Sequence, residues 1–417
     1  TMEVIGLLFV LRMGYLTMGN SAHALLISTV GFALYFKEYI FKDNPNGNSA
    51  WGILTALVLA FSAIISPFLA SRAYKTKKRS IWLAVTTLVC VIATSLLSFS
   101  FSEKAVVAIV IYFFSALGYY LALPIYNSYL PNITDSSRVQ KVSGAGWALG
   151  YLGGILSVGI CFMFGYLKHP VTETPELYRN IFLVAAGFNF VFSIPMIVVS
   201  FLTDSKEKVS DDKAVITQGW RLSDVLHIFK TENGKFIYTL LLVYWLVSEV
   251  SVVVVYYFAI FLKDYSGLAE GKILIYSIIG QLLAIVSTFS LGVLSNKIGG
   301  KKVLIGIVFA WSLVPFSLFL MSKGMSFWIS VIILGLVIGA YHSIIRGKIA
   351  QLSESFPNPE DKGSLFGFLE VSGRISQVIG PLLIAFVTLF LPLNYGIMFM
   401  AIFPIIALII LFRLKWQ

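Results

Sequence analysis

The stretch VSGAGWALGYLGG, residues 142–154, decides how this chain folds. It opens an apolar run that continues to Phe164, and the run is long enough to cross a membrane as a helix. Gly146, Gly150 and Gly154 recur every four residues, so a helix places them on one face. A face without side chains lets a neighbouring backbone approach closely, as small residues do between helices in lipid. We therefore expect a membrane-spanning helix whose Gly150 lies against another helix.

Composition places the whole chain in the membrane. Apolar residues make up 58% of the 417 and charged residues only 12%, and the mean hydropathy is +0.87. Soluble domains carry about 25% charged residues, so we expect an integral membrane protein with the lipid bilayer as a partner. The apolar runs have the length of spanning helices and exceed that of barrel strands. A net charge of +11 would favour nucleic acid for a soluble protein. Here the basic residues lie mostly in loops, and we expect no nucleic acid partner.

Twelve apolar spans can each cross a membrane as a helix. They are residues 4–36, 50–71, 81–101, 105–127, 143–167, 180–203, 235–261, 271–295, 303–322, 326–346, 363–389 and 393–413. With both termini on the cytoplasmic side, 21 of the 31 lysine and arginine residues fall in cytoplasmic loops and eight in outer loops. Basic loops prefer the cytoplasm, so this asymmetry predicts that orientation. In a bacterium such a protein belongs to the inner membrane.

A polar linker divides the spans into two sets of six. It covers residues 204–234, and its part 220–230 predicts an amphipathic helix lying on the membrane surface. We expect an N-terminal six-helix bundle over residues 1–203 and a C-terminal six-helix bundle over residues 235–417. The predicted fold class is an all-α membrane protein with twelve transmembrane helices in two pseudo-symmetric six-helix bundles.

Loop motifs support this repeat. Residues 67–79 join the second and third spans, and residues 291–302, LGVLSNKIGGKK, join the eighth and ninth. The second segment resembles the loop signature of the major facilitator superfamily, with Asn296 where an acid is usual. The first segment is a degenerate copy of the same signature.

Four stretches resemble one family within that superfamily. They are Asn20-Ser21-Ala22, Tyr126-Asn127 with Leu130-Pro131, residues 142–154, and residues 366–368 with Ser372-Gly373 and Gly380-Pro381. In these the chain is similar to the vacuole-effluxer family, which includes fungal vacuolar amino-acid exporters. The resemblance implies the major facilitator fold and a secondary transporter, a symporter or antiporter working by alternating access. Its substrate would be a small solute such as an amino acid. The chain departs from the family at Thr17 and Ser248, which replace acids, at Met18, which replaces tryptophan, and at Arg374, which replaces lysine.

Charged residues inside spans are costly in lipid, so each is a candidate functional group. Glu249 lies near the middle of the seventh span. It either takes up a proton, which would make protons the coupling ion, or forms a structural ion pair. Arg374 in the eleventh span follows Glu370 by four residues, so the two can pair on one helix face. Alternatively, Arg374 binds an anionic group such as a substrate carboxylate.

Polar residues of the spans extend this candidate site. Asn20 in the first span either bonds to another helix or, as the resemblance implies, faces the central cavity. His23 and His342 are either proton relays or hydrogen-bonded packing residues.

The junction of the fourth and fifth spans carries a polar and aromatic set. Tyr126, Asn127 and Trp147 either pack or line the cavity beside the glycine face. The expected substrate or coupling site in the central cavity therefore consists of Asn20, His23, Tyr126, Asn127, Trp147, Glu249, Glu370 and Arg374.

A second group of polar residues lies at the cytoplasmic loops. Arg138, Asn296, Lys297 and Arg346 stand at or next to span ends on that side. We expect them to take part in gating or anchoring and not in substrate contact.

The sequence carries no pattern of an enzyme. It has no P-loop, so ATP does not drive transport directly, and neither a Ser-His-Asp pattern nor metal-ligand spacing stands out. Cys90 and Cys161 lie in apolar spans, which argues against a disulfide framework. We expect no cofactor, no metal and a monomer.

Two alternative functions remain: a flippase or exporter of an amphiphile or lipid, which needs a cavity open sideways to lipid, and a non-transporting membrane receptor.

Overall fold

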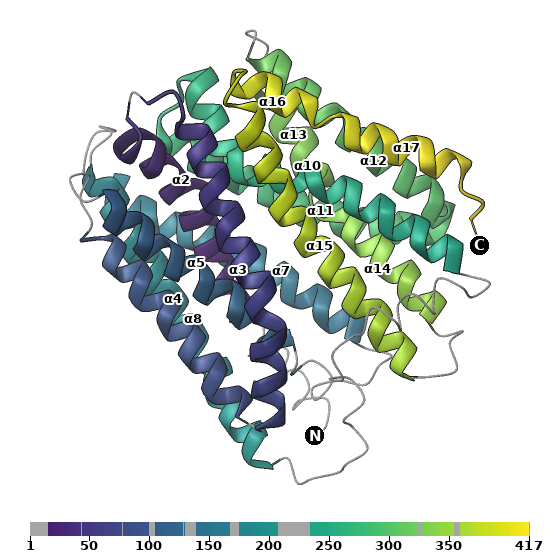
Figure 1. The fold of residues 1–417 in the computed structure, drawn as a ribbon, viewed down its shortest axis with the longest axis horizontal. Coiled ribbons are helices and arrows are strands. Elements are labelled where there is room, and N and C mark those ends of the chain that lie inside the picture. The colour runs from purple at the N-terminus through teal and green to yellow at the C-terminus, as the bar shows by residue number, and fades with distance from the viewer. Residues whose placement is uncertain are drawn as a thin grey trace. The chain divides into compact units, whose positions relative to one another are not determined.

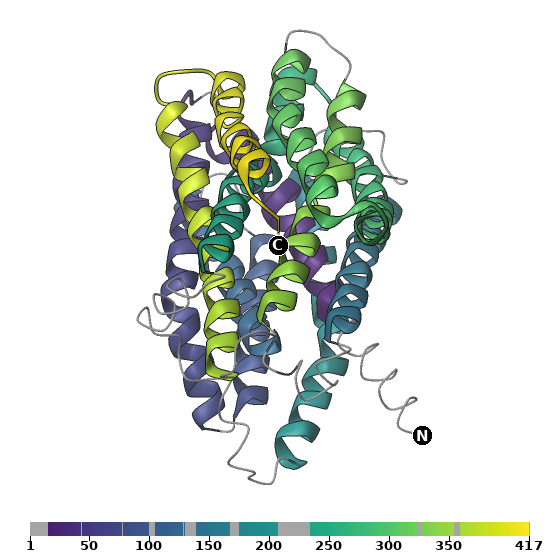
Figure 2. The same ribbon diagram turned by 90° about the vertical axis from the view of Figure 1, so that its right-hand side faces the viewer.

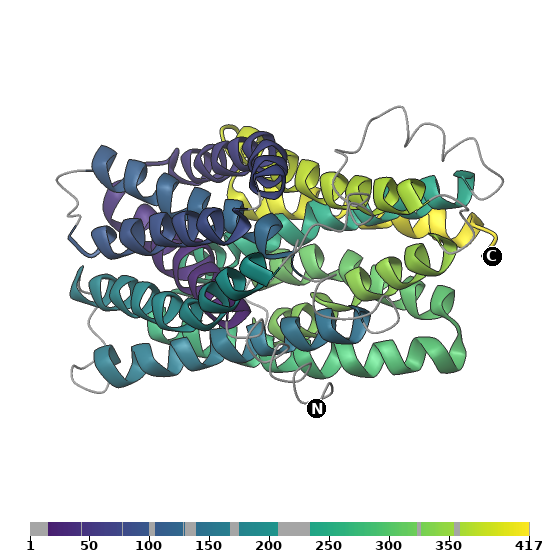
Figure 3. The ribbon, with the colours of Figure 1, turned by 90° about the horizontal axis from the view of Figure 1, so that it is seen from below.

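The computed structural model describes residues 16–42, 44–76, 78–99, 105–127, 129, 139–166, 175–206, 234–322, 327–353 and 359–416. These residues are helical almost throughout, and no strand occurs among them (Figure 1). Figures 2 and 3 show the same helices from two further sides. Within the described ranges, nine helices are long and apolar enough to cross a membrane. Two shorter apolar helices, Leu149–Phe164 and Gly373–Val387, lie in the fifth and eleventh expected spans.

Each expected span contains residues that the structure describes as helical. The first corresponds to helical residues 16–23 followed by η1 (Ala24–Gly31), α2 (Phe32–Tyr35) and η2 (Phe36–Ile40). The next five correspond to α3 (Gly47–Lys75), α4 (Arg79–Leu97), α5 (Ala105–Asn127), α7 (Val139–Cys161) with η4 (Phe162–Tyr166), and α8 (Pro175–Lys206). The last six correspond to α10 (Gly234–Ser266), α11 (Glu270–Ile298), α12 (Gly300–Met321), α13 (Phe327–Val337) with α14 (Ala340–Ser353), α15 (Pro359–Val387), and α16 (Leu393–Phe399) with α17 (Ile402–Arg413). The amphipathic helix expected at residues 220–230 lies outside the described residues.

The chain forms two compact units. Unit 1 contains Thr1–Gly47, Leu57–Val209 and Gly267–Ile278, and unit 2 contains Asn48–Ala56, Ser210–Ser266 and Ile279–Gln417. The first turns of α3 therefore belong to unit 2, and the first turns of α11 belong to unit 1.

In unit 1, α4 packs against both α5 and α8 (Figure 1). The packing includes polar contacts, because the amide of Asn189 on α8 lies 3.5 Å from the Sγ atom of Cys90 on α4. Farther along the first span, Phe32 stacks on Tyr112 of α5 with ring centroids 4.2 Å apart. Stacked aromatic rings of this kind add to the burial that holds helices together.

The glycine face of α7 packs against the first helix, as predicted. A Cβ atom at Gly150 would lie 2.8 Å from the hydroxyl oxygen of Ser21 and 3.5 Å from the carbonyl oxygen of Thr17. A Cβ atom at Gly153 would overlap Met18. The expected contact of Gly150 is confirmed, and Gly153, which the spacing of four did not include, shares it.

In unit 2, α10 is the central helix. It has 33 residues, and most of them are buried. It packs on α12, α14, α15, α16 and α17. The tenth span is interrupted between α13 and α14, where the indole Nε1 atom of Trp311 on α12 donates to the carbonyl oxygen of Val337 at 3.2 Å. That hydrogen bond satisfies a carbonyl that the helix end would otherwise leave open.

The loop signature at residues 291–302 also has a structural partner. The Nζ atom of Lys301 at the start of α12 donates to the carbonyl oxygen of Leu414, just beyond α17, at 2.6 Å. A cation at the carboxyl end of a helix interacts favourably with the helix dipole. This lysine thereby ties the end of the described chain to α12.

Candidate functional site

Unit 1 holds two buried polar side chains on the first helix. Asn20 and His23 are three residues apart, so they share a helix face. The Nε2 atom of His23 lies 2.8 Å from the hydroxyl oxygen of Ser115 on α5. That hydroxyl lies 2.7 Å from the hydroxyl oxygen of Thr94 on α4. The ring of His23 also stacks on Tyr119, with centroids 5.1 Å apart. His23 therefore connects the first helix to α5 and, through Ser115, to α4.

One nitrogen of each residue lacks a hydrogen-bond partner in the part of the chain that the structure describes. The Nδ2 atom of Asn20 and the Nδ1 atom of His23 are buried and have no hydrogen-bond partner among the described residues. Leaving a buried polar atom unsatisfied costs about 1–3 kcal/mol, so such an atom calls for a water or a ligand. The π-helical turns of η1 begin directly after His23, and such turns are frequent at functional sites. His23 is thus a packing residue at one nitrogen and a candidate ligand contact at the other.

The aromatic and polar set at the end of the fourth span is only partly described. Tyr126 is buried in the core of unit 1 with Leu16, Leu83 and Met196. Asn127 is the last residue of α5, and Trp147 lies in α7. The side chains of these two lie outside the described part of the structure, and their roles stay predictions.

Unit 2 buries Glu249 in the middle of α10. The side chain has no exposed surface, and neither carboxylate oxygen has a hydrogen-bond partner among the described residues. The carboxylate instead packs on the backbone of α15, where a Cβ atom at Gly380 would lie 3.1 Å from its Oε2 atom. Burying an ion without a partner costs several kcal/mol. The structural ion pair considered from the sequence is therefore not formed with any described residue.

The residue before Glu249 faces a different helix. The hydroxyl oxygen of Ser248 lies 3.3 Å from that of Tyr341 on α14. Next to it, the Nδ1 atom of His342 lies 3.2 Å from the hydroxyl oxygen of Tyr244 on α10, and the rings of Tyr341 and His342 have centroids 3.9 Å apart. These contacts make a polar and aromatic cluster between α10 and α14, while Glu249 points to α15.

Arg374 lies on α15 one residue after Gly373. It is half-buried, and Gly373 packs on α10, since a Cβ atom there would lie 3.1 Å from the hydroxyl oxygen of Tyr244. Glu370 lies in the same helix, but its side chain is outside the described part of the chain. The expected pairing of Glu370 with Arg374 stays a prediction.

The residues expected to take part in gating are largely outside the description. Arg138 is not among the described residues. Asn296 in α11 and Arg346 in α14 are described by their backbones alone. Lys297, in the last turn of α11, is exposed.

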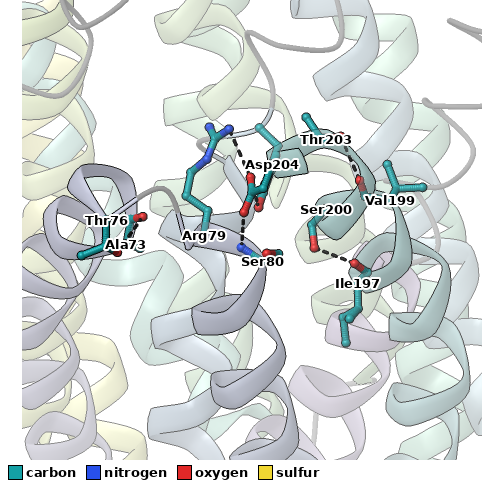
Figure 4. A network of polar contacts seen from close by, with 10 residues as sticks. Ala73, Thr76, Arg79, Ser80, Ile197, Val199, Ser200, Thr203 and Asp204 are labelled. Atoms are coloured by element: carbon teal, nitrogen blue, oxygen red, sulfur yellow. Dashed lines mark hydrogen bonds and ion pairs between the residues drawn. The ribbon is translucent and has the colours of Figure 1, made fainter. Parts of the chain in front are cut away.

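A charged network at one end of unit 1 was not predicted from the sequence. Asp204 in the last turn of α8 accepts a hydrogen bond from the backbone N–H of Ser80 through Oδ2 at 2.8 Å (Figure 4). Its Oδ1 atom accepts the hydroxyl of Tyr129 at 3.0 Å. The Nη2 atom of Arg79 lies 3.5 Å from Oδ1. The guanidinium also lies over the ring of Tyr129, 4.4 Å from its centroid. Asp204 thereby caps the start of α4 from another helix.

Both charges of this network are nearly inaccessible to solvent. The side chains of Arg79 and Asp204 are 3% and 9% exposed. Burial, together with the neighbouring carboxylate, raises the pKa of the Tyr129 phenol, so the phenol remains a donor. From the sequence, Arg79 is one of many loop cations and Asp204 is the first residue of the linker. Because 124 residues separate Ser80 from Asp204, spacing along the chain carries no signal of their contact.

Solved structures with this fold are transporters. The chain matches a bacterial homologue of the human lysosomal transporter Spinster with a TM-score of 0.67 and 15% identity, over 97% of this chain and 95% of that one. It matches the xylose transporter XylE from E. coli with the same TM-score and 14% identity, over 100% of both chains. It matches the nucleoside transporter NupG with a TM-score of 0.67 and 13% identity, over 97% of this chain and 99% of that one. The fold class is therefore that of the major facilitator transporters, as the sequence predicted.

The sequence narrows this class to a family. The profile of the family described as "Vacuole effluxer Atg22 like" matches residues 38–417, and this chain belongs to that family. The uncharacterized MFS-type transporter YxiO of Bacillus subtilis (strain 168) is 24% identical over 374 residues, 88% of this chain and 85% of its own length. The multidrug resistance protein MdtG of Proteus mirabilis (strain HI4320) is 25% identical over 393 residues, which are 92% of this chain and 89% of its own length. The protein is a multi-pass secondary transporter of a small molecule and not an enzyme.

Proposed function

We propose that this chain is a proton-coupled transporter of a small solute, an amino acid or a similar small organic molecule, and that Glu249 carries the coupling proton. It acts as a monomer in the cytoplasmic membrane, with both termini in the cytoplasm. The observation that carries the proposal is the burial of Glu249 without a partner among the described residues. The solute class follows the family to which the chain belongs.

The physical argument for a proton starts from charge burial. An unpaired carboxylate costs several kcal/mol in such a place, so the packing seen here favours the neutral acid. Alternating access requires at least one other packing of the helices. A carboxyl group that reaches water in that other packing loses its proton there and regains it on return. Proton binding is then linked to the conformational equilibrium, and a proton gradient can drive transport.

The candidate substrate contacts in unit 1 support an anionic or carbonyl group on the solute. The amide nitrogen of Asn20 donates hydrogen bonds, and Nδ1 of His23 donates when it carries the ring proton. Neither has a partner among the described residues. A carboxylate oxygen accepts from both kinds of donor. In unit 2, Arg374 is the corresponding candidate for an anionic group.

Vesicle transport tests this proposal. Purified protein is reconstituted in lipid vesicles, a panel of amino acids and small organic molecules is supplied, and an internal pH-sensitive dye records proton movement. We expect a substrate to move protons, and we expect the Glu249→Gln variant to bind that substrate but to lose the response to a pH gradient. Asp264→Asn is the matched control, because Asp264 is an exposed acid on the same helix. Full proton movement in the Glu249→Gln variant would contradict the proposal.

Export of an amphiphile is the second candidate function, and an apolar groove on unit 1 favours it. The groove has a volume of about 290 Å³ between α4 and α5, and its walls suit an alkyl chain. It is lined by Val89, Ile92, Ala93, Leu96, Val110, Ile111 and Phe114. One relative is named as a multidrug resistance protein. In the same vesicles, proton movement driven by an amphiphilic cation and by none of the small polar solutes would favour this function.

A further inference from the structure

Glu249 and the segment Gly380-Pro381 of α15 are in direct contact within unit 2. A Cβ atom at Gly380 would lie 3.0 Å from the carbonyl oxygen of Glu249, 3.0 Å from Cγ2 of Val253 and 3.1 Å from Oε2 of Glu249. A side chain at position 380 would therefore press on the carboxyl group of Glu249 and on its backbone carbonyl. The helices α10 and α15 pack side by side at this point (Figure 1).

Pro381 makes this part of α15 a place where the helix can bend. Proline has no backbone N–H, so it removes one helical hydrogen bond, and its ring crowds the preceding turn. Sharp bends in helices are found at such positions. A change in the packing of Glu249 on Gly380 therefore acts beside the position where α15 lacks a helical hydrogen bond.

The same segment of α15 also holds the first turns of α3. A Cβ atom at Gly52 would lie 2.6 Å from the carbonyl oxygen of Pro381 and 2.9 Å from Cβ of Ala385, and it would overlap the hydroxyl of Tyr257. The residues Asn48–Ala56 belong to unit 2, as α15 and α10 do. The segment from Gly380 to Ala385 is thus packed both against Glu249 and against α3.

Hydrogen bonds complete this docking of α3. The hydroxyl of Tyr257 on α10 donates to the carbonyl oxygen of Asn48 at 3.0 Å. The indole of the buried Trp51 donates to the carbonyl oxygen of Tyr256 at 3.1 Å.

A third contact ties α3 to α15 itself. The hydroxyl oxygens of Ser49 and Thr388 lie 2.9 Å apart, where Thr388 directly follows α15. Ser49 is buried. The exposure of this residue therefore reports whether the start of α3 is docked.

We propose that Gly380 is a positioning residue through which the protonation state of Glu249 controls how Asn48–Ala56, the first turns of α3, pack on α10 and α15 within unit 2. With neutral Glu249, the carboxyl group packs on Gly380, and the α15 segment holds Gly52, Ser49 and their neighbours. With ionised Glu249, the charge requires water, the contact with Gly380 opens, and the first turns of α3 loosen from α15. This inference goes beyond the proposed function and rests on it only for proton uptake by Glu249.

Other charged groups near α10 do not explain such a response as directly. Arg374 lies on α15 six residues before Gly380, about 9 Å along the helix axis. The imidazole of His342 on α14 is bonded to Tyr244, five residues before Glu249. The start of α3 carries no charged residue. The remaining charged or titratable residues on the elements packed against α10 are Lys301 and Lys302 on α12, Tyr341, Arg346 and Lys348 on α14, Glu360, Asp361, Lys362 and Glu370 on α15, Tyr395 on α16 and Arg413 on α17.

Labelling of a cysteine at position 49 tests the inference. Ser49→Cys is introduced into the full chain, whose native Cys90 and Cys161 are buried, and a sulfonated maleimide is added to protein in lipid vesicles. We expect the labelling rate to rise by about tenfold between about pH 6 and about pH 8, relative to the same thiol in the Ser49→Cys/Glu249→Gln variant. That comparison cancels the effect of pH on the thiol itself. Asn46→Cys, at an exposed position before α3, controls for reagent access.

A second variant tests the role of Gly380 directly. In the Ser49→Cys chain, Gly380→Ala pushes on Glu249, and we expect fast labelling at every pH. Gly306→Ala on α12 is the matched control, because its Cβ atom meets nothing within 4 Å. If the Gly380→Ala variant does not fold, the labelling of Ser49→Cys with and without Glu249→Gln still tests whether Glu249 controls the exposure of position 49.

The outcomes separate this inference from the proposed function. A pH response of labelling that persists in Glu249→Gln, or labelling without any pH response, overturns the inference. Loss of proton-coupled transport in Glu249→Gln with unchanged labelling keeps the proposed function and overturns the inference. Labelling that depends on Glu249 without proton-coupled transport supports the inference and contradicts the proposed function.

Discussion

Two carboxylates with little exposed surface in the described part of this transporter, Asp204 and Glu249, differ in their surroundings. Asp204 in unit 1 accepts from the N–H of Ser80 and from Tyr129, and it lies beside the guanidinium of Arg79. Glu249 in unit 2 has no hydrogen-bond partner for either oxygen among the described residues. Both are costly to place in a protein interior, but only the first has its cost offset by partners.

This difference separates a carboxylate that stabilises the fold from a carboxyl group that is a candidate for proton transfer. The carboxylate of Asp204, with its three partners, holds three chain segments together. A carboxyl group packed on a bare helix backbone is stable only as long as it stays neutral, so its state can change with conformation. Low exposure of a charge therefore does not by itself distinguish the two kinds, and its partners do.

The same amide substitution at the two carboxylates should have opposite effects. Asp204→Asn removes the negative charge beside the buried Arg79 and should destabilise the protein by about 3–5 kcal/mol. Glu249→Gln should leave the unfolding temperature unchanged or raise it, because the neutral amide resembles the neutral acid that this packing favours and loses no partner among the described residues. Thermal unfolding of the purified variants in one detergent measures both. Equal destabilisation by the two substitutions would break the comparison.

Packing in unit 1 can be tested at the glycine face of α7. Gly150→Leu places a large side chain against Ser21 and should destabilise the protein by about 3 kcal/mol, the upper part of the usual range for overpacking. The measurement is the yield of monodisperse protein together with its unfolding temperature. Gly159→Leu on the same helix is the control, because a Cβ atom there meets nothing within 4 Å. A stable Gly150→Leu variant with unaltered transport would remove the argument for close packing.

The smallest expected effect concerns the polar cluster of unit 2. Tyr244→Phe removes the hydroxyl that lies 3.2 Å from Nδ1 of His342, and a single hydrogen bond is worth about 0.5–1.5 kcal/mol. Thermal unfolding should show this small loss, with the pH response of transport kept. If Tyr244→Phe abolishes the pH response, then His342 and not Glu249 carries the proton, and the comparison of the two carboxylates loses its functional meaning.

Several candidate residues could be named from the sequence because of where they stand in apolar spans. Glu249 is an acid in the middle of the seventh span, and it is buried without a partner among the described residues. Gly150 was expected against another helix and lies on Ser21. Tyr126 was expected either to pack or to line the cavity, and its side chain is buried in the core of unit 1. These predictions needed only local information, since residue type and depth in a span set the cost of burial.

Other features had no local signal. Gly380 is part of a stretch that resembles the family, but its contact with Glu249 depends on which residue of α10 lies against it. Arg79 and Asp204 read as loop charges until the ends of α4 and α8 come together. Trp51 and Tyr257 read as ordinary interface aromatics, although each donates a hydrogen bond that docks α3.

The sequence by itself determined the class of fold, the number and order of the spans and the family of the protein. It could do so because lipid demands long apolar helices and because the motifs that resemble the family are short and local in the sequence. Only the tertiary structure decided which charges have partners. A partner is set by the packing of helices that are distant in the chain, and in lipid that packing depends on shape and hydrogen bonds at each contact. For this reason Asp204 and Glu249, both acids of apolar helices, have different surroundings among the described residues.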